Sequence, residues 1–416
     1  MGSSTPLVSA RPALLLALLG LGYFLFFFHQ VDLAERPYWD ERIYVNAART
    51  YLSSQKPYPN PEHPPLGKQI LSLGIELWGD RPQGWRFFSA LSGALSGVLM
   101  VALTYRLTGR QGVAAFVGAL FFLDPLLYLH FRLGMLDPPL LLFLLAATLS
   151  VFQFWENPKI ATPYLYLTGL LLGLALATKM LALVLAPVFW VLAAHRLRRE
   201  GLSKKSLLHL ALAGFLLPAA VYFGTHAALG YGLGETWRLF LYNLNFHQYH
   251  RGAANMSSRW YEWLYVGKPL WYFWKQVEAG RVQAVLGTGN LVLWVGAELL
   301  ACYAVYRKRR SPEVWTLAAL ILIQFALYAF KPITFLQYMV LILPFLYILM
   351  GVGIADLFDR FEGRYRRILQ VDLACFFLGS LLVFWNYFPY LQGKVMSREA
   401  FEAVGAMGKA LPPEQP

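Results

Sequence analysis

The sequence predicts an all-α polytopic membrane protein, and its composition and apolar stretches both support this class. Of its 416 residues, 57% are hydrophobic and only 14% are charged, whereas soluble domains carry about 25% charged residues. Stretches of about 20 apolar residues fit a bilayer core of about 30 Å. The predicted spans are 12–30, 84–106, 112–130, 138–155, a long run at 164–194, 206–229, 288–306, 313–330, 335–355 and 367–388.

The run 164–194 is too long for one simple crossing. At about 1.5 Å per residue it makes one overlong helix of about 46 Å or two short ones. Basic residues favour the cytoplasmic side, and two crossings place nearly all of the basic loops on one side. We therefore predict two crossings and eleven spans in total. The loops then assigned to the cytoplasm contain Arg106, Arg110, Lys159, Arg196, Arg198, Arg199, Lys204, Lys205, Arg307, Lys308, Arg309, Arg310, Arg360, Arg364, Arg366 and Arg367.

This topology places three segments on the non-cytoplasmic side, namely 31–83, 230–287 and the tail 389–416. It also places Lys179 at the outer tip of two short helices. A charge at membrane depth costs about 2.5–3.5 kcal/mol on the insertion scale, so Lys179 is a candidate functional residue. The alternative is that its side chain extends to the membrane surface.

The loop 31–83 concentrates polar residues directly after the first apolar segment. Asp40 and Glu41 are adjacent acids, and the sequence HPPLGK at 63–68 supplies His63 and Lys68. Five prolines between positions 57 and 65 exclude helix and favour an extended path. The loop therefore presents its polar groups from a stiff backbone, although a rigid connection between two helices would show the same pattern.

A second polar group lies between the third and fourth spans. Asp124, Arg132 and Asp137 fall within 14 residues between otherwise uncharged helices. An Asp124–Arg132 or Arg132–Asp137 ion pair that holds the helices together is one interpretation. A role for all three in a site is the other.

The loop 230–287 is rich in aromatic residues, which commonly anchor a segment at headgroup level. Its polar members that could reach a ligand are His247, His250, Arg259 and Lys268. The histidine spacing matches no zinc pattern, so we expect no metal and no cofactor. The two cysteines, Cys302 and Cys375, lie in apolar stretches and predict neither a disulfide nor a metal site.

Several motifs occur in an order that resembles one family. These are Asp40-Glu41, HPPLGK at 63–68, Trp85-Arg86, Arg132 with Leu136-Asp137, Gly173 to Lys179, and Ser258-Arg259-Trp260 to Trp271-Tyr272. The chain resembles the protein O-mannosyltransferases, polytopic glycosyltransferases of the GT-C type. The loop 230–287 is too short to hold the β-trefoil domain of the eukaryotic members, so the resemblance implies a compact bacterial form. His130 replaces a serine of the family pattern.

The resemblance implies a reaction and roles for these residues. A lipid-phosphate donor has a weakly basic leaving group and needs charge neutralisation, whereas an acceptor hydroxyl needs a general base. We expect Asp40 to be that base, worth about 10²–10⁴-fold, and Glu41 to position the loop or the acceptor. Arg86, Lys179 and Arg259 would hold the donor phosphate. The residues expected to support the site are His63, Lys68, Asp124, Arg132, Asp137, His247 and His250.

Three functions remain open from the sequence. The leading one is an inverting transferase that moves mannose from polyprenyl-phosphate mannose to Ser or Thr of exported proteins in a bacterial inner membrane. The second keeps the donor type but uses a glycolipid acceptor, as aminoarabinose transferases do. The third is a lipid or solute transporter, for which internal repeats would be expected. No nucleotide-binding Gly-rich loop occurs, and no nucleic-acid partner is expected.

Overall fold

The computed structural model describes residues 10–33, 35–157, 161–201, 203–249, 257–278, 280–331 and 333–405. Helices occupy every stretch predicted to span the membrane. Their bounds are α1 Ala10–Phe28, α4 Pro82–Thr108, α5 Gln111–Phe122, α6 Pro125–Phe131, α7 Asp137–Glu156, α8 Ala161–Thr178, α9 Leu181–Arg199, α10 Lys204–Ala211, a π-helix Leu212–Leu216, α11 Leu217–Ala227, α14 Leu291–Arg307, α15 Pro312–Ala329, a 3₁₀ helix Leu336–Leu341, α16 Leu343–Arg360 and α17 Gly363–Leu391.

Six of the helices in the described ranges are long and apolar enough to cross a membrane. A seventh span is formed if α5 and α6 are taken together, although they bend by 71° at their junction. The helices α1 and α8 are shorter apolar segments. The protein is thus an integral membrane protein, and the number eleven for its spans stays a prediction.

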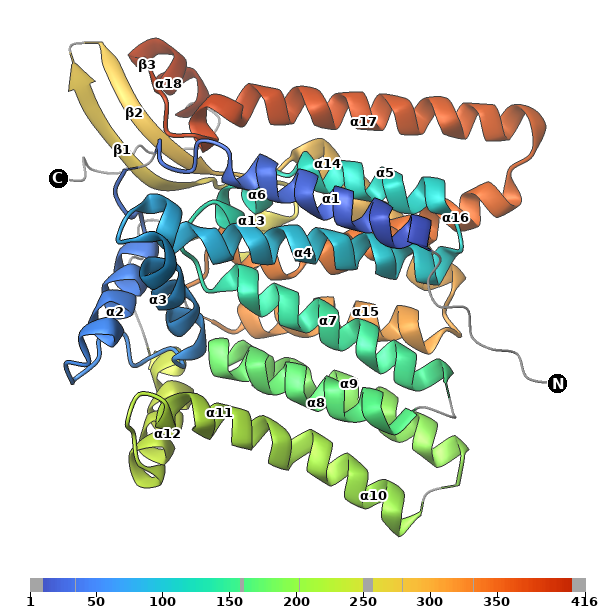
Figure 1. Cartoon of the computed structure of the whole chain (residues 1–416). Coiled ribbons are helices and arrows are strands. Elements are labelled where there is room, and N and C mark those ends of the chain that lie inside the picture. The colour runs from blue at the N-terminus through green and yellow to red at the C-terminus, as the bar shows by residue number, and fades with distance from the viewer. Residues whose placement is uncertain are drawn as a thin grey trace.

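The long run 164–194 is divided as expected. The helix α8 ends at Thr178 and α9 begins at Leu181, so Lys179 and Met180 form the break between them. The two helices then run side by side in the bundle (Figure 1). This break places the Lys179 side chain at one end of the bundle rather than inside a helix.

The segments outside the bundle gather at that same end (Figure 1). The first loop contains α2 (Glu41–Ser53) and α3 (Leu66–Trp78), and the second contains α12 (Leu233–Tyr249) and α13 (Trp260–Trp263). The helix α3 approaches the start of α4 very closely, because a Cβ on Gly74 would lie 2.3 Å from the Gly84 carbonyl oxygen. Only glycine permits that contact.

A small antiparallel sheet at this end was not expected from the sequence. It has the order β1 (Leu270–Glu278), β2 (Arg281–Gly287) and β3 (Val395–Ser397), with Leu270 opposite Gly287. The tail after α17 returns to supply β3 and α18 (Arg398–Gly405). The aromatic and β-branched residues of β1 favour a strand as much as an interfacial layer, and only the pairing with β2 distinguishes the two.

Candidate active site

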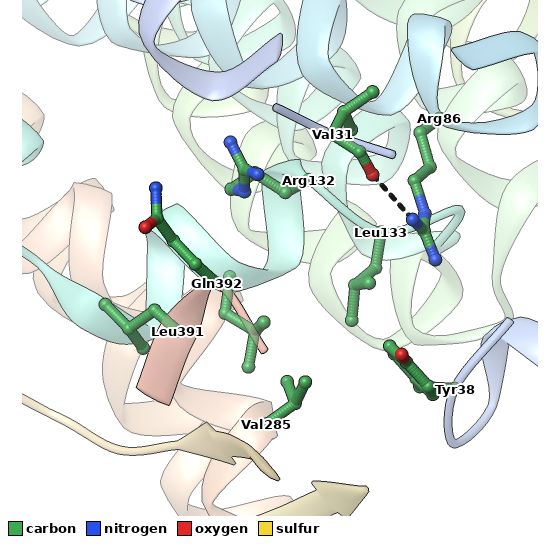
Figure 2. A pocket seen from close by; sticks show the side chains of 9 residues that line it. Val31, Tyr38, Arg86, Arg132, Leu133, Val285, Leu391 and Gln392 are labelled. Atoms are coloured by element: carbon green, nitrogen blue, oxygen red, sulfur yellow. Dashed lines mark hydrogen bonds between the residues drawn. The ribbon is translucent and has the colours of Figure 1, made fainter. Parts of the chain in front are cut away.

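Glu41 and Arg86 form a fully buried ion pair beneath the first loop. Arg86 donates from Nε to Glu41 Oε1 and from Nη2 to Oε2, both at 2.8 Å, and both side chains are 0% exposed. Glu41 also accepts the backbone N–H groups of Gly134 at 2.6 Å and Tyr38 at 3.0 Å. Arg86 further donates to the Val31 carbonyl at 2.7 Å (Figure 2). The pair therefore ties the first loop, α2, α4 and the turn before α7 together.

This pairing argues against the expectation that Arg86 holds a donor phosphate. Its guanidinium already has carboxylate and carbonyl acceptors and no exposed surface. The cavity that it lines with Tyr38, Arg132 and Gln392 measures about 10 Å³ (Figure 2), which is room for about one water molecule. We therefore assign Arg86 and Glu41 a structural role.

Arg132 caps the end of α1 and makes neither of the ion pairs considered from the sequence. Its Nη1 donates to the carbonyls of Phe27 at 3.0 Å and His29 at 2.5 Å, and its Nη2 donates to Gln30 at 2.8 Å. These are carbonyls that a helix end leaves without intrahelical partners. The guanidinium also lies 4.9 Å from the ring centre of Tyr128. Arg132 is therefore a helix cap, and its expected role in supporting the site stays a prediction.

Asp124 is likewise structural. Its Oδ1 accepts the Leu127 N–H at 2.9 Å, which caps α6, and its Oδ2 accepts from Trp294 Nε1 at 2.7 Å and Tyr347 hydroxyl at 2.5 Å. The residue is fully buried. These contacts join α6, α14 and α16, and the expected role of Asp124 in supporting the site stays a prediction.

Lys68 holds the proline-rich segment in place. Its Nζ donates to the carbonyls of Asn60 at 2.5 Å and His63 at 2.8 Å, and the residue is buried. It is thus enclosed by its own loop, and its expected role in supporting the site stays a prediction. The His63 ring packs against Tyr44, with the ring centres 5.8 Å apart.

Asp40 lies at the N-terminal end of α2 and is only half-buried, unlike its neighbour Glu41. Its Oδ2 accepts a hydrogen bond from Gln337 Nε2 at 3.2 Å. Burial raises the pKa of Asp40, while the positive charge of Lys179 and the Gln337 hydrogen bond oppose that rise. A carboxylate with a raised pKa at an accessible position suits general-base chemistry.

Lys179 and Asp137 form an ion pair near Asp40. The Nζ–Oδ1 distance is 2.8 Å, and the side chains are 15% and 7% exposed. The charge of Lys179 is thus compensated by a carboxylate within the protein, and its partly exposed ammonium can still reach a ligand.

Lys331 is a member of this region that the sequence did not single out. It lies half-buried after α15, with Nζ 5.9 Å from the ring centre of Tyr338. Burial and the charge of Lys179 lower its pKa to about 8. Within the described ranges it forms no ion pair. The ammonium groups of Lys179 and Lys331 therefore lie in the same region, and of these two only Lys179 has a carboxylate partner among the described residues.

The remaining candidates from the second loop do not join this group. Arg259 is exposed at the start of α13. The side chain of His247 and the whole of His250 lie outside the described residues. Among the residues that the structure describes, no group of three or more His, Cys, Asp or Glu could hold a metal ion.

A model of the dolichyl-phosphate-mannose-protein mannosyltransferase family matches residues 17–228, half of the chain. The chain belongs to this family. The matched region includes Asp40, Asp137 and Lys179. The mannosyltransferase family consists of membrane glycosyltransferases, so the protein is an enzyme of that type.

Individual relatives agree with this family. A polyprenol-phosphate-mannose–protein mannosyltransferase of Mycobacterium tuberculosis is 25% identical, over 88% of this chain and 85% of the relative. One from Corynebacterium glutamicum is 24% identical over the same shares. An undecaprenyl phosphate-α-4-amino-4-deoxy-L-arabinose arabinosyl transferase of Pseudomonas fluorescens is 24% identical over 74% of this chain and 50% of its own length.

Solved structures show that the fold is shared with two kinds of GT-C enzyme. The Saccharomyces cerevisiae protein O-mannosyltransferase Pmt1-Pmt2 complex, bound to its sugar donor, aligns with a TM-score of 0.78 at 13% identity, over 96% of this chain and 92% of the other. The structure of ArnT from Cupriavidus metallidurans bound to undecaprenyl phosphate aligns with a TM-score of 0.65 at 16% identity, over 96% and 80%. The predicted fold class is thereby confirmed.

Proposed function

We propose that this protein is an inverting mannosyltransferase that moves mannose from polyprenyl-phosphate mannose to Ser or Thr hydroxyls of exported proteins. The observation that carries the proposal is the half-buried carboxylate of Asp40 in the same region as the Lys179–Asp137 ion pair, in a chain of the mannosyltransferase family. This arrangement supplies one base and fixed positive charge, which are the two things that the reaction needs.

The proposed step is a single displacement at the anomeric carbon. Asp40 accepts the proton of the acceptor hydroxyl while the hydroxyl oxygen forms a bond to C1 of mannose. The bond between C1 and the phosphate oxygen breaks, and the electron pair leaves with polyprenyl phosphate. Attack opposite the leaving group inverts the anomeric configuration. Adjacent residues project in different directions, and Glu41 is fully buried against Arg86, so one carboxylate acts alone.

Lys179 and Lys331 are proposed to neutralise the phosphate. Lys179 is already paired with Asp137, whereas Lys331 forms no ion pair within the described ranges, so the ammonium of Lys331 is available to a phosphodiester. Lys179 would then share its ammonium between Asp137 and the phosphate. Fixed positive charge where a leaving group develops its charge is usually the largest catalytic contribution.

The active site is proposed to face the non-cytoplasmic side of a bacterial plasma membrane. The described parts of the loops 31–83 and 230–287 and of the tail, residues 389–405, lie at one end of the bundle (Figure 1). Clustered basic residues lie at the other ends of the helices, for example Arg307 at the end of α14 and Arg360 at the end of α16. Basic residues favour the cytoplasmic side, which supports this orientation.

A glycolipid acceptor is the second candidate function. The similarity to the Pseudomonas fluorescens arabinosyl transferase and to the ArnT structure supports it, and the proposed base and phosphate-binding groups would serve either acceptor. The protein acceptor is favoured because the protein mannosyltransferases match over more of their own length.

The test is transfer by the purified full-length protein. Polyprenyl-phosphate mannose is supplied with either a Ser/Thr-rich peptide or lipid A, and products are identified by mass spectrometry. The proposal expects a hexose on peptide hydroxyls and none on lipid A. Hexose on lipid A alone would establish the glycolipid function instead, and no transfer to either would contradict both. Mass spectrometry of exported proteins from cells with and without the gene gives the corresponding result in vivo.

A further inference from the structure

A chain of three hydrogen bonds leads from the membrane bundle to Asp40. His130 Nε2 lies 2.5 Å from the Tyr272 hydroxyl, Tyr272 donates to Gln337 Oε1 at 3.0 Å, and Gln337 Nε2 donates to Asp40 Oδ2 at 3.2 Å. The three residues come from α6, β1 and the 3₁₀ helix 336–341, and all are buried. The displacement described above assigns none of them a role.

The direction of this chain follows from the chemistry of its ends. A charged carboxylate only accepts hydrogen bonds, so Gln337 turns its NH₂ group to Asp40 and its oxygen to Tyr272. The single hydroxyl proton of Tyr272 is then used toward Gln337, and His130 Nε2 must carry the proton that it donates. His130 Nδ1 is buried and has no hydrogen-bond partner in the described structure. A second proton there would bury an unpaired donor and a charge, so the ring is neutral.

We propose that Gln337 is a positioning residue for the general base, held in one orientation by Tyr272 and His130. It occupies Asp40 Oδ2 and so leaves Oδ1 as the oxygen that takes the acceptor proton. This inference rests on the proposed function. Within the described residues, Asp40 Oδ1 accepts no hydrogen bond. If the Gln337 amide were rotated by 180°, its oxygen would face an oxygen of the charged carboxylate with no proton between them, which is unfavourable.

The surroundings of Asp40 make pH the appropriate readout. The charged groups that act on its carboxyl are Lys179, Asp137 and Arg42, and the neutral phenols nearby are Tyr44, Tyr272 and Tyr338. A hydrogen bond to the charged form of an acid lowers its pKa. Removing the Gln337 amide should therefore raise the pKa of Asp40 further above its ordinary value. A residue that only fills space would leave that pKa unchanged.

The experiment measures the pH dependence of mannosyl transfer to a Ser/Thr peptide by the full-length Gln337→Leu variant. The acid limb of kcat/KM should move to higher pH by about one unit, which is about a tenfold loss at a pH on the limb. The plateau kcat should fall by about tenfold because the base is less well oriented, with the donor KM unchanged. Tyr272→Phe and His130→Leu should shift the limb in the same direction by less. His130→Gln retains an N–H donor for Tyr272 and should stay near wild type.

An acid limb that stays in place in Gln337→Leu, together with a lowered melting temperature, would show a packing role and overturn the inference. Gln337→Glu provides a second test if the leucine variant does not fold. It keeps the shape but places a second carboxyl beside Asp40, so its acid limb should also move to higher pH, and an unmoved limb would again overturn the inference. Activity in Asp40→Asn would instead contradict the proposed base itself, so the two failures are distinguishable.

Discussion

Replacing Glu41 by Gln should destabilise the protein without removing its ability to bind donor. The substitution keeps the side-chain shape but removes the charge that compensates Arg86, and both side chains are 0% exposed. It also replaces one carboxylate oxygen by an NH₂ group, which then faces two donors, an Arg86 N–H and the backbone N–H of either Gly134 or Tyr38. Breaking a buried ion pair by removing one partner costs about 3–5 kcal/mol, and we expect a loss of unfolding free energy in that range.

The assay is reversible unfolding in mixed micelles, combined with melting temperatures measured with and without donor lipid. Donor that binds only the folded protein raises its stability by mass action. Glu41→Gln should keep that increment while the empty protein melts at a lower temperature. The matched control is the double variant Glu41→Leu/Arg86→Met, which removes both charges and should recover part of the stability.

The structural assignment would be refuted by the opposite pattern. If Glu41→Gln melted like wild type but lost the donor increment, Glu41 and Arg86 would belong to the donor site. Equal stability of the single and double variants would also contradict the argument, because it would mean that the buried guanidinium of Arg86 needs no counter-charge.

Two further predictions concern the proposed site. Lys179→Ala and Lys331→Ala should each lose most of the donor-induced rise in melting temperature. The control Lys275→Ala, at an exposed position on β1, should keep that rise. If both site variants kept the full rise, the two lysines would not belong to the phosphate site. The rate of transfer should fall with decreasing pH, and the fall should begin above the ordinary carboxyl range of about pH 4. The sign follows because Asp40 acts in its charged form and burial raises its pKa, so the charged fraction is lost at a higher pH than for an exposed aspartate. A kcat/KM profile that stays flat down to pH 4 would contradict this assignment.

The features that sequence predicts well here are those set by local composition. The break at Lys179 follows from the length of the apolar run 164–194 and the charge within it. The position of Asp40 outside the bundle follows from the polar composition of the loop 31–83. Both features depend only on residues close together in the chain, so the lengths of the apolar stretches are enough to predict them.

The roles of the buried charges could not be predicted in the same way. Arg86 meets Glu41 across 45 positions, and Arg132 caps a helix that ends about 100 positions earlier. In the sequence these residues are equally compatible with a ligand site. Only the burial and the partners of each cation distinguish a structural arginine from one that binds phosphate.

The same reason explains the residues that sequence analysis missed. Gln337 lies 297 positions from Asp40, and Tyr272 lies 142 positions from His130. A glutamine at the start of an apolar segment and a tyrosine in an aromatic loop are ordinary membrane-protein residues. Their position in one hydrogen-bonded chain depends on the sheet and the 3₁₀ helix, which bring distant segments together at one end of the bundle.

Turnover by Asp40→Asn is the most direct test of the central claim. The purified variant is supplied with polyprenyl-phosphate mannose and a Ser/Thr peptide, and mannosylated peptide is counted by mass spectrometry beside the donor-induced shift in melting temperature. We predict that transfer falls by at least about 10², the lower bound for a general base, while the donor still raises the melting temperature as in wild type. More than about a tenth of wild-type turnover in a folded, donor-binding Asp40→Asn protein would contradict the claim that Asp40 is the base.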